Sequence, residues 1–194
     1  MARTKNFNQD EVLDKAVQLF WKKGYNATSA NDLVKELGLS RSSLYDTYGD
    51  KRKLFIQSLN RYRNEVVEKT IKMIDNSTDI RQTIKDIFAL VIEQDIHSKI
   101  PKGCFMVNST VELSASDKEI ATIVEQNQKD IENAFEKAIL KGQENGTIIN
   151  TQKASHLAKF FYNSITGIRV AMRYNKFKNS IDEVVAINLS LLDT

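Results

Sequence analysis

Apolar residues recur every three or four positions along almost the whole chain, the spacing that places them on one face of an α-helix. Between these stretches stand residues that end helices, including Gly24, Gly146 and the single proline, Pro101. The pattern therefore predicts an all-α protein. The expected helices span about residues 9–23, 30–37, 41–48, 51–75, 80–97, 104–113, 117–145, 152–171 and 181–192.

The clearest helix boundaries lie early in the chain. Ser29 is followed three residues later by Asp32, a capping-box arrangement that predicts a helix from residue 30. Gly38 ends this helix after about two turns, and Ser40 caps a second short helix over 41–48. Two short helices joined by a tight turn form a helix-turn-helix, whose second helix fits the major groove of DNA. We therefore expect its exposed residues to read DNA.

Residues suited to cap a helix also precede the other predicted helices. The helix over 51–75 belongs to both halves of the chain, which makes it a candidate lever between them. The helices over 152–171 and 181–192 have wide apolar faces, as a dimer interface would use. The expected caps are Asn8, Asp50, Ser116 or Asp117, Thr151 and Ser180.

Composition and charge narrow the class of protein. With 194 residues and 41% hydrophobic content, the chain is long enough to bury a core. Residues 1–53 hold ten Lys or Arg against seven Asp or Glu, whereas residues 54–194 hold eighteen of each. The net charge of +3 therefore lies in the predicted DNA-binding part, although a solvated surface explains so small an excess about as well. The absence of a signal peptide or a membrane-length apolar run, together with a single cysteine, predicts a soluble, cytoplasmic protein.

Several short segments follow one another in a characteristic order and spacing: Gly24-Tyr25, Thr28-Ser29, Leu37-Gly38-Leu39-Ser40, Ser43-Leu44-Tyr45 and Gly49-Asp50-Lys51 through Leu54. In these segments, over roughly residues 8–60, the sequence resembles the TetR (AcrR-type) family of bacterial one-component repressors. The resemblance implies a DNA-binding domain at 1–53 and an effector-binding and dimerisation domain at 54–194. It also implies three partners: a double-stranded DNA operator, a second copy of the chain and a small-molecule effector.

Several side chains of the helix-turn-helix are candidates for DNA contacts. Arg41 can donate both arms of its guanidinium to a guanine, and short serines let the helix approach the base edges. Family resemblance places phosphate contacts at Thr28, Tyr45 and Lys51. Asp46 departs from the family pattern, so it either accepts from a cytosine or points at Arg41. The predicted DNA-binding residues are Thr28, Ser40, Arg41, Ser42, Ser43, Tyr45, Asp46, Thr47 and Lys51.

Two further sites are expected in the C-terminal half. An apolar lining with few polar groups is typical of a small-molecule site in a helical bundle, although most such residues are plain core. The predicted effector pocket comprises Phe88, Ile92, His97, Cys104, Phe105, Asn108, Phe161 and Tyr162. The predicted dimer interface comprises Phe161, Ile165, Ile168, Val184 and Leu191.

Other functions receive less support. One Cys and two His show no metal-binding spacing, and no phosphate loop or catalytic triad stands out, so we expect no enzyme, cofactor or metal. A helix-turn-helix adaptor that binds only proteins stays open as an alternative. A second alternative is redox or electrophile sensing by Cys104, because the Gly103-Cys104 segment resembles a branch of the family in which some members respond to oxidants. Sensing would require a nearby cation such as Arg169 or Arg173.

Overall fold

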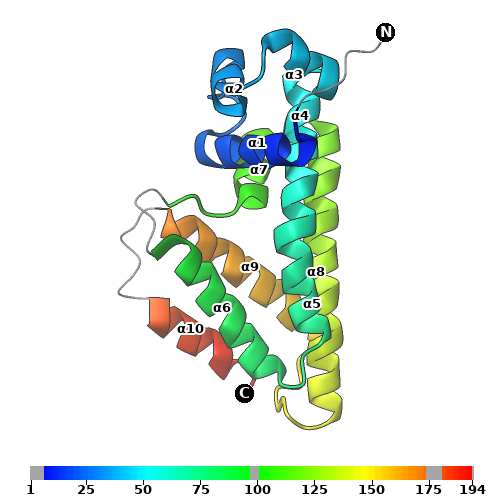
Figure 1. The fold of residues 1–194 in the computed structure, drawn as a ribbon. Helices are drawn as coiled ribbons and strands as arrows, with labels where there is room; N and C mark the ends of the chain where they lie inside the picture. The colour runs from blue at the N-terminus through cyan, green and yellow to red at the C-terminus, as the bar shows by residue number, and fades with distance from the viewer. Residues whose placement is uncertain (1–6, 97–100, 174–180, 194) are drawn as a thin grey trace.

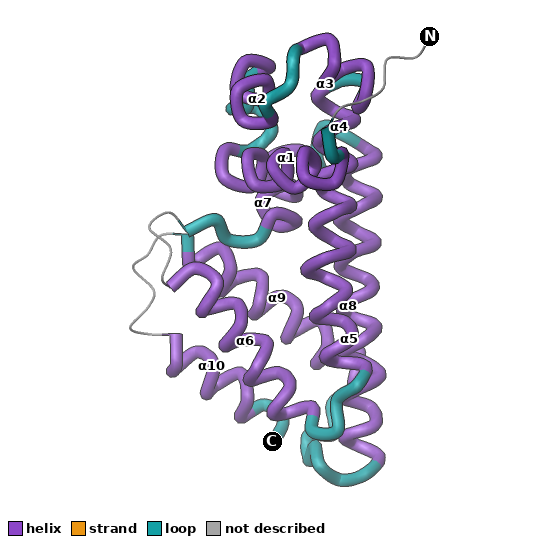
Figure 2. The backbone as a smooth tube through the Cα atoms, in the orientation of Figure 1, coloured by secondary structure: helices purple, strands orange, loops and turns teal. Residues whose placement is uncertain are grey.

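The computed structural model describes residues 7–96, 101–173 and 181–193. The part of the chain that it describes folds into helices joined by loops and turns, and contains no strand (Figure 2). The predicted all-α fold is therefore confirmed. None of the described helices is long and apolar enough to cross a membrane.

The N-terminal helices α1 (Gln9–Lys23), α2 (Ala30–Leu37) and α3 (Arg41–Tyr48) follow the predicted boundaries. The capping box forms as expected, with the Ser29 hydroxyl and the Asp32 carboxylate each accepting from the other residue's backbone N–H. Gly38 ends α2 with a φ of 67°, a left-handed conformation that costs glycine little. These three helices form the upper part of the molecule in Figure 1.

The predicted helix over 51–75 forms, but it is interrupted. It consists of α4 (Lys51–Tyr62), a π-helical turn η1 (Arg63–Val67) and α5 (Glu68–Asp75). The backbone N–H of Glu68 bonds to the carbonyl of Arg63, five residues earlier, which is the π-helical spacing. The predicted domain boundary between residues 53 and 54 falls inside α4, so the chain passes between the two parts without a linker.

The C-terminal part comprises α6 (Ile80–Ile96), α7 (Phe105–Leu113), α8 (Lys118–Glu144), α9 (Ala154–Met172) and α10 (Ile181–Ser190). Asp117 caps α8 as predicted. Thr151 does not cap α9, because that helix begins three residues later without a side-chain cap. Ser180 lies outside the described residues. Figure 1 shows α8 running beside α5, while α6, α9 and α10 gather on the other side.

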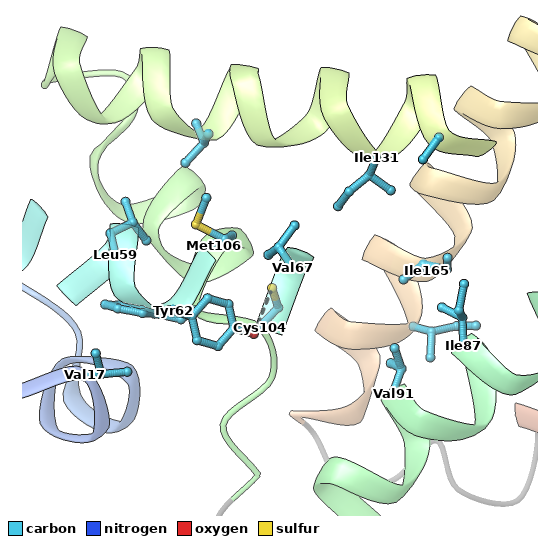
Figure 3. Packing of buried hydrophobic residues seen from close by; sticks show 14 of the residues in the cluster. Val17, Leu59, Tyr62, Val67, Ile87, Val91, Cys104, Met106, Ile131 and Ile165 are labelled. Atoms are coloured by element: carbon cyan, nitrogen blue, oxygen red, sulfur yellow. Dashed lines mark hydrogen bonds between the residues drawn. The ribbon is translucent and has the colours of Figure 1, made fainter. Parts of the chain in front are cut away.

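Apolar side chains from several helices meet inside this bundle. Ile131 of α8, Ile165 of α9 and Ile87 of α6 point toward one another, each at most 7% exposed (Figure 3). Across the view, Tyr62 of α4 lies against Cys104, and Met106 of α7 is nearby. The core is thus continuous from the α4–η1–α5 helix to α9, so a change in packing at one of these helices alters the packing at the other.

An aromatic column joins the N-terminal helices to α7. The Phe20 and Phe55 rings are 5.1 Å apart, and Phe55 is 5.4 Å from Phe105, both in edge-to-face contact. Tyr62 completes the column against Trp21 and Phe105, at 5.0 and 5.7 Å. Such contacts add to the burial of apolar surface. Side chains of α1, α4 and α7 therefore pack as one layer.

Candidate DNA-binding and effector sites

The helix α3 is fixed by its apolar side and leaves its polar side free. Leu44 and Tyr48, four residues apart, are 0% and 5% exposed. The Tyr48 hydroxyl donates to the carbonyl of Gln9 at 3.0 Å, which ties the end of α3 to the start of α1. The Ser40 hydroxyl accepts from the Ser43 N–H at 3.2 Å and so caps the helix. A helix held in this way presents its other face in a fixed orientation.

That other face carries the predicted base readers Ser42 and Asp46, and Arg41 is the first residue of the helix. Arg41, Ser42 and Asp46 are exposed. Within the described ranges, Arg41 and Asp46 make no hydrogen bond or ion pair, with each other or with any other side chain. The pairing of Asp46 with Arg41, one of two expectations, is therefore not seen. Both side chains are available to base edges in a groove.

Two predicted contact residues have roles inside the protein. Thr28 is 0% exposed, and its hydroxyl donates to the carbonyl of Gly24 at 2.6 Å. The predicted phosphate contact from this side chain is thus wrong, because the side chain is buried and its proton is used. Thr47 is half-buried and donates to the carbonyl of Ser43 at 2.8 Å.

The predicted phosphate-binding pair lies near the start of α4. Tyr45 is half-buried against the core. The Lys51 ammonium sits 4.3 Å from the centre of the Tyr25 ring, a cation–π distance. Burial lowers the pKa of Lys51 and raises the pKa of Tyr25. Lys51 is therefore positioned by an aromatic ring that the sequence reasoning did not assign to it.

Two carboxylates of the C-terminal half bind the N-terminal DNA-binding part. Glu112 of α7 accepts from the backbone N–H groups of Tyr25 and Asn26, at 3.0 and 2.7 Å. Arg52 binds Asp117 through two nitrogens, at 2.6 and 2.8 Å, and these bonds lower the pKa of Asp117 from 3.8 to about 2. The loop after α1 is thus bonded to the end of α7, and the start of α4 is bonded to the residue that caps α8.

The C-terminal bundle contains a small cavity of about 20 Å³. Two of the predicted effector residues, Cys104 and Tyr162, line it. Burial raises the pKa of Tyr162 and of neighbouring Tyr62, so both phenols stay neutral. The Arg169 guanidinium also lines the cavity and donates to the Cys104 sulfur at 3.0 Å, and the Tyr62 hydroxyl lies 3.6 Å from that sulfur.

The remaining predicted effector residues do not converge on this cavity. Phe88, Phe105 and Phe161 are at most 1% exposed and are packed in the core. Asn108 accepts from Arg173 at 2.9 Å in a separate surface depression of about 550 Å³. Ile92 is half-buried against the core. His97 lies outside the described residues.

Polar residues at core positions indicate where the cavity lies more accurately than the apolar residues from which the pocket was predicted. Asn127 is 3% exposed and stands between Val124 and Ile131 on the buried face of α8. Arg169 follows Ile165 by one turn on α9. A polar residue on an apolar stripe is a signal that can be read from sequence, but the prediction of the pocket did not use it.

The predicted dimer interface requires correction. Phe161, Ile165 and Ile168 are 0%, 6% and 3% exposed within one chain, because they face the bundle. A side chain already buried in this way has no surface to offer a partner. Val184 and Leu191 are half-buried. The exposed apolar residues of these two helices are Phe160, Val170 and Ile187, at 43%, 39% and 65%.

The described residues contain no group of three His, Cys, Asp or Glu that could hold a metal ion.

Known proteins share this sequence pattern and this fold. The chain is 29% identical to the uncharacterized HTH-type transcriptional regulator YezE of Bacillus subtilis (strain 168) over 194 residues, all of both chains. It is 29% identical to the HTH-type transcriptional repressor ComR of Escherichia coli (strain K12) over 190 residues, 97% of this chain and 90% of that one. The TetR family transcriptional regulator CifR, solved as a cysteine mutant with 26 bp double-strand operator DNA, superposes with a TM-score of 0.83 at 18% identity, covering 100% of this chain and 99% of that one.

Family models cover both halves of the molecule. Residues 12–57, which include the helix-turn-helix, match the model of bacterial regulatory proteins of the tetR family. Residues 81–187 match the model of a tetracyclin repressor-like C-terminal domain. With its reading helix exposed and its C-terminal bundle of the matching type, the chain belongs to the TetR family of DNA-binding transcriptional regulators.

Proposed function

We propose that the protein is a repressor that binds an inverted-repeat operator as a homodimer and leaves it when a small effector binds the C-terminal bundle. The observation that carries the proposal is the exposed face of α3, where Arg41 and Asp46 have no partner within the described residues. Unpaired charges on a helix narrow enough for the major groove suit base recognition.

In this proposal some side chains near the helix-turn-helix contact DNA bases and others contact the DNA backbone. Arg41 donates to guanine O6 and N7, and Asp46 accepts from a cytosine N4. Ser42 and Ser43 allow close approach, while Tyr45 and Lys51 contact phosphates. Free N–H groups in the first turn of α4 bind the same phosphate as Lys51.

The dimer would form through the outward face of α9 and α10. Phe160, Gly167 and Val170 lie on the exposed side of α9, and Ile187 lies on the exposed side of α10. At Gly167 an added side chain would meet no atom within 4 Å, so this side of α9 is open within the chain. A two-fold pair of such faces would hold two α3 helices about 34–36 Å apart, one turn of DNA.

Release would act through α7, which contacts both sites. Cys104 precedes α7 at the cavity, while Glu112 near its end binds the loop after α1. Trp21 of α1 donates to the carbonyl of Gly103 at 3.0 Å. An effector that binds one arrangement of α7 more tightly than another shifts the population of DNA-binding dimers.

The proposal is tested by selecting bound duplexes from random DNA with the unliganded protein. We expect an inverted repeat, because a two-fold dimer presents α3 twice. Gel shifts on that sequence should weaken steeply as salt is added, since phosphate contacts release counterions. An adaptor that binds only proteins would select no sequence and bind no DNA even at low salt.

A second candidate function is oxidant sensing by Cys104. The observation that favours it is the guanidinium of Arg169 at 3.0 Å from the sulfur, the type of neighbour that reactive cysteines have. The other cation considered, Arg173, binds Asn108 instead. Peroxide or quinone should then release operator from the wild type but not from Cys104→Ser. Equal release from both proteins would remove this candidate.

A further inference from the structure

A surface cleft lies beside the cavity in the C-terminal bundle. The cleft has a volume of about 220 Å³ and lies between the η1–α5 helix and α6. Thr70, Ile87 and Arg169 line both the cleft and the cavity of about 20 Å³, so the two spaces are adjacent and these three residues stand between them. The cleft is also lined by four apolar residues and two charged ones at its wall: Val66, Met73, Leu90 and Val91, and Glu65 and Lys69.

Arg169, where the two spaces meet, is a cation without an anion. Its one hydrogen bond, within the described ranges, goes to the Cys104 sulfur, and no carboxylate there lies within ion-pair distance. Glu65 also lines the cleft, but it pairs with Arg61 at 2.5 Å. A guanidinium has five N–H donors, so several remain for a ligand. Leaving a half-buried charge unpaired is costly, and an anion entering the cleft removes that cost.

The inner cavity contains a second unsatisfied group. Asn127 is 3% exposed and lines the cavity, and its Oδ1 atom has no hydrogen-bond partner. A buried carbonyl oxygen of this kind requires a donor, and leaving it without one is unfavourable. A volume of about 20 Å³ suffices for one water molecule or one hydroxyl group.

We propose that the effector is a small organic carboxylate with an apolar body. Its carboxylate binds Arg169, since a single guanidinium matches one planar anion with two oxygens. Its body fills the cleft, whose 220 Å³ is below the roughly 300–1,000 Å³ of drug-sized sites. A hydroxyl or amine group next to the carboxylate, at the inner end of the ligand, donates to Asn127 and raises affinity. This inference rests on the proposed function, whose effector it assigns to a class.

The position of the cleft connects this ligand to the lever helix. Glu65 and Val66, on its wall, belong to the π-helical turn η1. Such turns are frequent at functional sites, since a π-turn can change the register of a helix. A carboxylate seated against η1 therefore acts on the segment that joins α4, next to the DNA-binding helices, to α5. The inner cavity is nearly closed in this conformation, so entry of a ligand group favours a more open arrangement.

The test is a ligand panel measured by calorimetry and thermal shift on the full-length protein. Butyrate, phenylacetate, benzoate and mandelate, which is phenylacetate with a hydroxyl beside the carboxylate, are each compared with the corresponding neutral amide. We expect the acids to bind and the amides to bind at least about tenfold more weakly, the effect of losing a hydrogen-bonded charge. Arg169→Gln should weaken acid binding to the same degree, whereas Arg169→Lys should retain part of it. Asn127→Ala should remove any advantage of mandelate over phenylacetate.

Arg173→Gln is the matched control, because Arg173 lies one turn further along α9 but faces the separate depression. This variant should bind acids as the wild type does. Equal binding of acids and amides, unchanged acid binding by Arg169→Gln, or no binding of any acid by the wild type would overturn the inference. Operator binding is measured in parallel. If the protein binds its operator and is released by a neutral compound, the proposed function stands and only the assignment of a carboxylate effector fails.

Discussion

The helix-turn-helix and the α9–α10 region were predicted from the same kind of pattern, with different outcomes. In the helix-turn-helix, Ser29 and Ser40 cap α2 and α3 at the predicted residues. In α9, the apolar stripe was placed at a dimer interface, whereas Phe161 and Ile165 are buried in the chain's own core. The difference lies in range: a cap is decided within four residues, while the partner of an apolar face is decided by helices far along the chain.

An apolar stripe therefore states that a face is buried, without stating by what. The exposed face of α9 includes Gly167 and Phe160. This face is less apolar than the buried face of the same helix. Obligate interfaces resemble a core cut in half, but this applies only to what is left after the chain has buried its own core. The assignment of the buried and exposed faces of α9 can be tested by substituting neighbouring residues, one from each face.

The largest expected effect is at Phe161. Its ring is 0% exposed and lies 6.3 Å from the Phe135 ring of α8. Phe161→Ala should lower the free energy of unfolding by about 3–5 kcal/mol, because it removes buried apolar area and leaves a cavity. Urea denaturation at a fixed protein concentration measures this loss.

The adjacent residue gives the matched comparison. Phe160 is 43% exposed, so Phe160→Glu should leave each chain folded and shift the protein to monomers by light scattering. Val111→Glu, at an 83% exposed position on α7, should leave the dimer intact. A folded, monomeric Phe161→Ala protein together with a dimeric Phe160→Glu protein would reverse our assignment of the two faces.

The next effect concerns DNA affinity. Arg41→Ala should weaken operator binding by about 1–3 kcal/mol per half-site and leave scrambled DNA much less affected, because a base contact is lost. Lys51→Ala should weaken both DNAs alike and reduce the salt slope by about one unit per contact. Gel shifts at two salt concentrations measure both. Equal losses on both DNAs for Arg41→Ala would place this side chain on the backbone.

A smaller effect is expected at the cap of α3. Ser40→Ala should destabilise the protein by about 0.5–2 kcal/mol, because the Ser43 N–H loses its acceptor. Ser42→Ala, two residues on, removes a hydroxyl that accepts from no helix N–H and bonds only to the exposed Ser40 hydroxyl, and should change stability by less than about 0.5 kcal/mol. Thermal or urea unfolding of the two variants side by side provides the measurement. Equal stability would mean that tertiary packing, not the cap, fixes the start of α3.

The smallest effect lies at the junction between the two regions. Arg52 holds the pKa of Asp117 at about 2, below its ordinary 3.8. Because the folded-state pKa is the lower one, this ion pair stabilises the protein above pH 3.8 and loses its contribution as pH falls toward about 2. Asp117→Asn should therefore flatten the fall in melting temperature across that range. Asp46→Asn, at a carboxylate that makes no ion pair within the described residues, serves as the control, and an identical acid response in both variants would contradict the role of Asp117.

The sequence by itself determined the helices, their order and the reading face. Helix boundaries at Asn8, Asp50 and Asp117 are hydrogen bonds between a side chain and a backbone group two or three residues away, so local sequence specifies them. The same holds for Ser42 and Asp46, whose exposure follows from their place opposite Leu44 and Tyr48 on a short helix.

Only the tertiary structure decided the contacts between distant segments. Glu112 of α7, for example, reaches the loop after α1 from 86 residues away. Arg169 meets Cys104 across 65 residues, which turned an apolar pocket into one with a cation and an unpartnered amide. Periodicity gives the direction of a side chain around its own helix but not the helix that it meets, because that depends on crossing angles and on packing of the whole core.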